Sequence, residues 1–316
     1  MGTGFWSWNY FFSVKIHRFK ASFTRFEPII SMTMHTILVP YDFSEQAEYA
    51  FQFAQQLATK TAGKLKLVHI VETPTTQSFS TMGEMNLDSA PLNQVYMIEL
   101  VEKRKKQLQE IEELHQNKGY TFQTRLAFGN PYAGISAEIT DLKADLVVMG
   151  SKGSSGLEEL LIGSNTEKVV RHAKCPVITV KQPVKVDEIK KIIFASDFSE
   201  VNRNVIHHVK ILQELLRAEL SLVKINTPSF FETSKDSRQK IEQFVTQHGL
   251  SNTQAVIYNS TSEEEGIIEY AEESNADMIA MATHGRTGFM HLLSGSIAED
   301  VVNHAKRPVW TMKITK

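Results

Sequence analysis

The chain has 316 residues, about twice the length of a typical single domain, and 42% of them are hydrophobic, which is enough for two cores. Lys and Arg number 34 against 36 for Asp and Glu, so the net charge is -2, and no basic stripe favours nucleic-acid binding. The single cysteine excludes an internal disulfide framework and fits a reducing compartment. No apolar run reaches the roughly 18 residues of a membrane-spanning helix, so we expect a soluble, cytoplasmic protein without a membrane partner.

Residues 1–33 differ in composition from the rest of the chain. They hold nine aromatic residues, four Lys or Arg and one acid, Glu27. A secretory signal carries its positive charges before its apolar stretch, whereas here the aromatic stretch comes first. A membrane-surface anchor or a transit peptide stays open. We favour an upstream start codon, with the protein beginning at Met32 or Met34, or else a disordered extension.

From residue 36 onward, short β-branched apolar runs alternate with longer runs of helical period, which indicates βαβ units around a parallel sheet. The predicted strands are 36–40, 65–71, 121–128, 145–149 and 176–180, followed by 191–195, 219–225, 253–258, 277–281 and 308–312. Three- and four-residue steps between apolar positions, among charged neighbours, predict an amphipathic helix. Its apolar residues are Ile98, Val101, Leu108, Ile111 and Leu114.

The chain also repeats itself. Residues 37–44, Ile-Leu-Val-Pro-Tyr-Asp-Phe-Ser, return 155 positions later as Ile-Ile-Phe-Ala-Ser-Asp-Phe-Ser, and later segments return after 132 positions. The second copy is therefore 23 residues shorter, and the difference falls on the Ser/Thr/Met-rich segment Thr73–Asn93, which we interpret as a surface loop. A polar linker at 181–187 separates the copies. We expect an N-terminal extension of 1–33, a first domain of 34–182 and a second domain of 188–316.

A glycine-rich stretch follows the fourth predicted strand. It reads Gly150-x2-Gly153-x9-Gly163-Ser164-Asn165-Thr166 and leads into a helix. It lacks the spacing of a P-loop. Glycines nevertheless let backbone N–H groups approach phosphate oxygens, and a helix N-terminus adds donors and a positive dipole end. Because Ser and Asn are also favoured helix caps, a purely structural cap is the alternative.

Three features together resemble the universal stress protein family: Asp42 after the first strand, the motif Gly150-x2-Gly153-x9-Gly163-Ser164, and a last strand Cys-Pro-Val-Ile-Thr-Val. The resemblance covers both halves of residues 34–316. It implies an α/β fold of two tandem five-stranded, parallel, Rossmann-like domains of the adenine nucleotide alpha hydrolase-like type, each of strand order 3-2-1-4-5. Ligands bind such sheets where strands one and four are neighbours. In single-domain relatives the last strands form a dimer, so 177–180 and 309–312 are expected to pair as an internal pseudo-dimer; a further homodimer of chains stays open.

The resemblance also implies an adenine nucleotide, ATP with Mg2+, as the ligand. Its first-half contacts would be Pro40, Tyr41, Asp42, Ile70, Met149, Gly150, Lys152, Gly153, Gly163, Ser164, Asn165 and Thr166. The matching residues of the second half are Asp197, Ile225, Gly285, Gly295 and Ser296, while Ala282 and Ala298 replace Gly150 and Thr166. We therefore predict that the first half is the better site and leave occupancy of the second open. Ile70 and Met149 also suit a plain strand core.

No Ser-His-Asp or paired-carboxylate arrangement indicates a dedicated catalytic site, so we assign no catalytic residue and no metal-ligating cluster. Asp42 is assigned to recognition. We expect an ATP-binding stress-response regulator with at most slow hydrolysis or autophosphorylation, whose nucleotide state alters the surface for an unidentified protein partner. The alternative is an interaction scaffold that binds no nucleotide and whose two sites are vestigial.

Overall fold

The computed structural model describes residues 17–18, 34–72, 90–152, 162–198, 203–284 and 297–314. The strands are β1 (His17–Arg18), β2 (Thr36–Pro40), β3 (Lys64–Val71), β4 (Thr121–Phe128), β5 (Leu146–Gly150), β6 (Val177–Val180), β7 (Lys191–Ala195), β8 (Glu219–Asn226), β9 (Thr253–Asn259), β10 (Met278–His284) and β11 (Val309–Ile314). The helices are α1 (Glu45–Thr61), α2 (Ala90–Leu114), α3 (Pro131–Leu142), α4 (Ser164–His172), α5 (Arg203–Leu216), α6 (Ser234–His248), α7 (Glu263–Glu273) and α8 (Ile297–His304).

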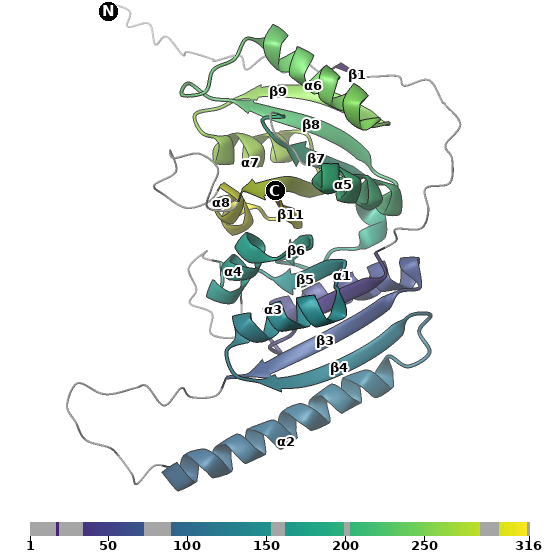
Figure 1. Ribbon diagram of the computed structural model, residues 1–316, viewed down its shortest axis with the longest axis vertical. Helices are drawn as coiled ribbons and strands as arrows, with labels where there is room; N and C mark the ends of the chain where they lie inside the picture. The colour runs from purple at the N-terminus through teal and green to yellow at the C-terminus, as the bar shows by residue number, and fades with distance from the viewer. Residues whose placement is uncertain are drawn as a thin grey trace, which may run out of the picture.

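All strands belong to one sheet of order β1-β9-β8-β7-β10-β11-β6-β5-β2-β3-β4. The ten strands predicted from the sequence all form, and the largest difference is that β10 and β11 continue to His284 and Ile314. Within each half the order is 3-2-1-4-5 and the strands are parallel, as expected for βαβ units. Figure 1 shows the sheet running from β9 to β4, with β6 and β11 in its middle.

The two five-stranded halves are not separate sheets, because their last strands join them into one sheet. β6 and β11 pair antiparallel, with Val177 opposite Thr311, Ile178 opposite Trp310 and Thr179 opposite Val309. The pairing expected for an internal pseudo-dimer is thus confirmed. An edge strand leaves its backbone N–H and C=O groups without partners, and this pairing satisfies those of both strands.

Two layers of helices cover the sheet. One apolar cluster extends over both halves and includes residues of α1, α5 and α6, together with Leu108 of α2. The opposite face carries one cluster in each half, the first including residues of α3 and α4 and the second residues of α7 and α8. The core is therefore continuous across the two halves on one face of the sheet.

Helix α2 only partly fulfils the amphipathic pattern. Leu108 is buried, but Ile98 is 64% exposed and Leu114 is 69% exposed. The reason is that α2 lies along β4, the last strand of the sheet (Figure 1), so the sheet covers only part of its apolar face. Because α2 begins at Ala90, the predicted surface loop Thr73–Asn93 ends in helix, and residues 73–89 lie outside the described residues.

Two residues of the N-terminal segment take part in the sheet. His17 and Arg18 form β1, which pairs antiparallel with Ala255 and Gln254 of β9. The rest of residues 1–33 lies outside the described residues. Among the helices that the structure describes, none is both long and apolar enough to span a bilayer.

Candidate functional site

The first-half site forms where β2 and β5 end side by side. The two strands pair in parallel, with Ile37 opposite Leu146 and Leu38 opposite Val147. After β2 the chain forms β3, which lies next to β2 on one side. After β5 it forms β6, which lies on the other side of the β2–β5 pair. This is the topological switch point at which open α/β sheets bind ligands. The structure thus brings the Asp42 turn and the residues after Gly150 to one edge of the sheet.

The turn after β2 has an unusual backbone. The Oδ1 of Asp42 accepts a hydrogen bond of 3.0 Å from the N–H of Ser44, and Ser44 in turn caps α1. Between them Phe43 has φ +65°, and its counterpart Phe198 in the second half has φ +59°. A bulky residue rarely adopts a positive φ, and such strain persists only where the surroundings impose it. In both halves a phenylalanine with positive φ therefore follows the aspartate, Asp42 or Asp197.

His69 supports this turn from β3. Its Nδ1 lies 2.7 Å from the carbonyl oxygen of Tyr41. Phe43 packs edge-on against the His69 ring at 4.9 Å, and the guanidinium of Arg104 lies 4.2 Å from the centre of the Phe43 ring. Because a carbonyl oxygen only accepts, the Nδ1–H of His69 donates to Tyr41. Burial lowers the pKa of the His69 ring. This positioning role of His69 was not predicted from the sequence.

Gly150 is required by the close approach of α1. A Cβ at this position would lie 2.9 Å from the backbone carbonyl carbon of Gln46. The side chain of Gln46 also holds the chain beyond β5, because its Oε1 accepts hydrogen bonds of 2.8 Å from Ser151 Oγ and from the N–H of Lys152. This role of Gln46 was not predicted from the sequence, since its partners lie more than a hundred positions away. Its second-half counterpart, Val201, lies outside the described residues.

The glycine motif ends at the N-terminus of α4. Gly163 is the N-cap residue, no side chain caps the helix, and the Gly163 N–H donates to the carbonyl oxygen of Ser151 at 2.8 Å. Ser164 is exposed and Asn165 is partly exposed. The N–H groups of a first helical turn have no intrahelical acceptor, so this end suits an anion.

Thr166 lies inside the protein, unlike Ser164 and Asn165. It is buried, and its Oγ1 donates a hydrogen bond of 3.0 Å to the carbonyl oxygen of Gly150. The hydroxyl proton of Thr166 is thereby used inside the protein, where it connects α4 to the end of β5. Thr166 thus stabilises the predicted phosphate site from beneath.

Ile70 and Met149 were predicted to flank an adenine. Met149 is 4% exposed and belongs to the core beneath α3 and α4. Ile70 is partly exposed and lies against α3, where a Cβ on Gly134 would come within 2.7 Å of the Ile70 Cδ1. The second half repeats this contact, with a Cβ on Gly266 only 2.6 Å from the Ile225 Cγ2. The two glycines are 132 positions apart, a repeat spacing that was available in the sequence as a signal.

Positive charge gathers at the same edge of the first half. Lys152 follows β5, and Lys181 follows β6. Burial, reinforced by the charge of Lys152, lowers the pKa of Lys181 to about 8. An anion near Lys152 and Lys181 would stabilise the positive charge of Lys181.

Part of the predicted site lies outside the described residues, namely Gly153, Gly285, Gly295 and Ser296. Of the other predicted positions, Pro40 ends β2 and Asp197 is exposed after β7. In the second half Ala282 stands near the end of β10 and Ala298 is buried at the start of α8.

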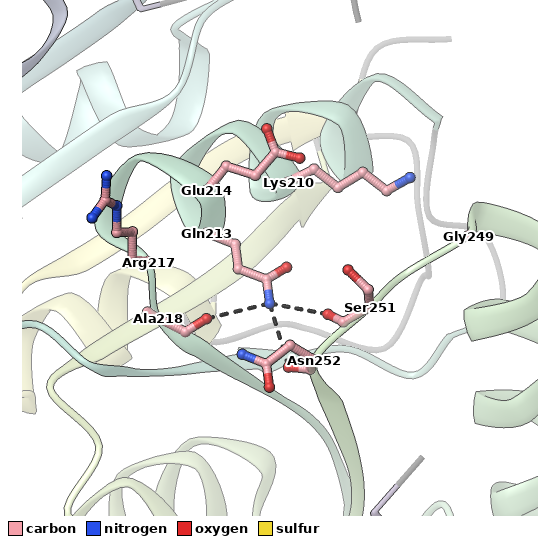
Figure 2. A pocket seen from close by; sticks show the side chains of 8 residues that line it. All are labelled: Lys210, Gln213, Glu214, Arg217, Ala218, Gly249, Ser251 and Asn252. Carbon is pink, nitrogen blue, oxygen red and sulfur yellow. Dashed lines mark hydrogen bonds between the residues drawn. The ribbon is translucent and has the colours of Figure 1, made fainter. Parts of the chain in front are cut away.

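A cavity of about 360 Å³ lies in the second half, at the N-terminal ends of the strands. It lies between the C-terminal end of α5 and the turn before β9 (Figure 2). Its lining residues are Lys210, Gln213, Glu214, Arg217, Ala218, Gly249, Ser251 and Asn252. Gln213 spans it, because its Nε2 donates to the carbonyl oxygens of Ala218 and Ser251 at 3.3 and 3.1 Å. The cavity includes none of the predicted site residues.

Comparison with known proteins adds the family context. The sequence pattern of the Universal stress protein family matches residues 33–181 and again 188–313. Universal stress protein SSP1056 of Staphylococcus saprophyticus is 30% identical over 173 residues, which are 53% of this chain and 95% of that protein. The crystal structure of a universal stress protein from Archaeoglobus fulgidus superposes with a TM-score of 0.67 at 20% identity, covering 88% of this chain and 97% of that one. A functionally unknown protein of Pseudomonas aeruginosa, PA1789, gives a TM-score of 0.62 at 22% identity, covering 89% and 92%. The last two show that the fold is shared over most of the chain, across both halves.

Proposed function

Because the chain belongs to the universal stress protein family, we propose that its first half binds ATP with Mg2+ and that the protein is a nucleotide-dependent regulator of a stress response. The observation that carries this proposal is the N-terminal end of α4. No side chain caps this end of the helix. It lies at the same edge of the sheet as the constrained Asp42 turn.

Each part of the edge suits a part of the nucleotide. The N–H groups of the first turn of α4, with the exposed Ser164 and the nearby Lys152, suit phosphate oxygens. The Asp42 carboxylate accepts hydrogen bonds from hydroxyl groups, as a ribose offers. The partly exposed Ile70 provides apolar surface beside them for a base. Mg2+, when bound with ATP, would neutralise phosphate charge.

The second half is proposed as the weaker site. It keeps Asp197 and Ile225, but Ala298 has no hydroxyl and cannot donate the hydrogen bond that Thr166 gives to the backbone carbonyl of Gly150. Any hydrolysis or autophosphorylation is proposed to be slow, because the sequence offers no nucleophile and base in a recognisable arrangement. With a slow reaction, the lifetime of the bound ATP would set how long the regulator stays in its ATP-bound state.

Equilibrium dialysis of the full chain against labelled ATP, with and without Mg2+, tests the proposal. The variant Asp42→Ala should bind roughly tenfold more weakly, the loss expected for one hydrogen bond to a charged group. Asp141→Ala on α3 is the matched control, since Asp141 is an exposed aspartate away from this edge and should bind like the parent. Equal binding by all three proteins would assign the nucleotide to another place.

One observation favours a second candidate, the interaction scaffold. Exposed large apolar side chains gather on α2 and at the end of β4, namely Val95, Tyr96, Ile98, Leu114 and Phe128. A protein partner is a natural cover for such a surface. A full chain that binds no ATP in dialysis would favour this candidate.

A further inference from the structure

The second half of the chain contacts the N-terminal end of α4 in the first half. The N–H of Ile162, which directly precedes the N-cap residue Gly163, donates to the Oδ1 of Asn303 on α8. The side chain of Ile162 packs against the apolar cluster of the second half, which includes Val301 and Val302 of α8. The entry to α4 is therefore held by a helix from the other half.

Asn303 makes a second contact at the same edge. Its backbone carbonyl oxygen accepts a hydrogen bond from the Nζ of Lys181. Lys181 follows Val180, which pairs with Gly150 at the end of β5, and its pKa is influenced by the charge of Lys152. One residue of α8 thus contacts the segments on both sides of the proposed phosphate site.

This contact is asymmetric between the halves. The repeat spacing aligns Asn303 with Arg171 of α4. Arg171 makes a different interaction: its Nε and Nη2 bind the two carboxylate oxygens of Glu299 at 2.6 and 2.5 Å. An arginine has no acceptor, so it cannot receive an N–H as Asn303 does. Arg171 therefore cannot make the contact that Asn303 makes with the N–H of Ile162. The contact concerns only the proposed phosphate site of the first half.

We propose that Asn303 is a positioning residue through which the second half fixes the entry of α4 in the orientation that the first-half nucleotide requires. The inference rests on the proposed function, because it concerns the same site. It makes the nucleotide affinity of the first half depend on a helix of the second half. A tandem chain differs in this way from a single domain, which carries no such contact within itself.

The test is calorimetric titration of Mg-ATP into the full chain, comparing the parent with Asn303→Ala, Asn303→Asp and His304→Ala. Loss of one hydrogen bond should weaken binding about threefold to tenfold in N303A. N303D keeps an acceptor oxygen but adds a negative charge beside the proposed phosphate site, so it is compared by amide exchange rather than by affinity. His304 is exposed on the same helix and contacts Glu264, so H304A controls for general loosening of α8. If N303A does not fold, Asn303→Ser serves as a shorter replacement.

Amide hydrogen exchange supplies a readout that does not need ATP. The Ile162 amide should exchange faster in N303A than in the parent and in N303D, while amides of the central strands stay unchanged. Parent-like affinity and exchange in N303A would overturn the inference and leave ATP binding intact. Absence of ATP binding by the parent itself would overturn the proposed function and this inference with it.

Discussion

The Oγ1 of Thr166 donates a hydrogen bond of 3.0 Å to the carbonyl oxygen of Gly150, joining the first turn of α4 to the end of β5. The second half has alanine at both positions, Ala282 and Ala298. Ala298 has no hydroxyl, so the second half lacks the donor of this contact, while the backbone carbonyl of Ala282 remains. The difference separates a half in which α4 is tied to the sheet edge from a half in which that tie is missing.

Replacing Thr166 by valine should lower the free energy of unfolding by about 1–2 kcal/mol, because the shape is kept while a buried hydrogen bond is lost. Thr166→Ser keeps the hydroxyl and should lose less. Urea unfolding followed by circular dichroism measures both. Equal stability of T166V and the parent would show that the hydrogen bond contributes nothing.

Gly150→Ala should destabilise the protein by about 1–3 kcal/mol, since a Cβ would lie 2.9 Å from the α1 backbone at Gln46. The reverse change in the second half, Ala282→Gly, removes a methyl group that the chain already accommodates. We expect it to cost about 0.5–1 kcal/mol through backbone entropy. Thermal unfolding of the two variants compares them directly. A Gly150→Ala protein as stable as the parent would contradict the packing argument.

Apolar periodicity and the repeat predicted the ten strands, because both are visible locally in the sequence. The strand order and the pairing of the last strands were expected only from the resemblance to the universal stress protein family. The sequence did not predict Gln46 or Asn303, since their partners Ser151 and Ile162 lie far along the chain. Their contacts exist only once the helices pack on the sheet. The stripe on α2 illustrates the same limit: periodicity shows which residues share a face, while the position of β4 at the end of the sheet decides how much of that face is covered.

His69 should make stability depend on pH. Burial lowers its pKa in the folded chain, so the unfolded chain binds the proton more readily. The stabilisation is full above the unfolded value of about 6.5 and decreases as the pH falls through that value toward the folded pKa. His69→Gln should therefore lose less stability than the parent when the pH is lowered from about 7.5 to about 5.5.

Urea unfolding at the two pH values measures this effect. Burial also lowers the pKa of His207 and His248, so part of the slope should remain in the variant. An unchanged slope in His69→Gln would mean that His69 titrates alike in both states.

Trp310 should couple the unfolding of the two halves. It is fully buried in β11, opposite Ile178 of β6, within the apolar cluster that extends over both halves. Trp310→Ala should cost about 3–5 kcal/mol, as for other large-to-small changes in a core. Phe231→Ala is the matched control, because Phe231 is 70% exposed and should change stability by less than about 0.5 kcal/mol. Two separate transitions in the parent protein, one for each half, would contradict a shared core.

The central claim is that the first half binds ATP at the entry of α4. Calorimetric titration of Mg-ATP into the full chain, stripped of nucleotide, tests it most directly beside two matched variants, Gly163→Val in the first half and Gly295→Val in the second. We expect the tighter site to be lost in folded G163V and kept in G295V. No binding at millimolar ATP, or binding that G163V leaves unchanged, would contradict it.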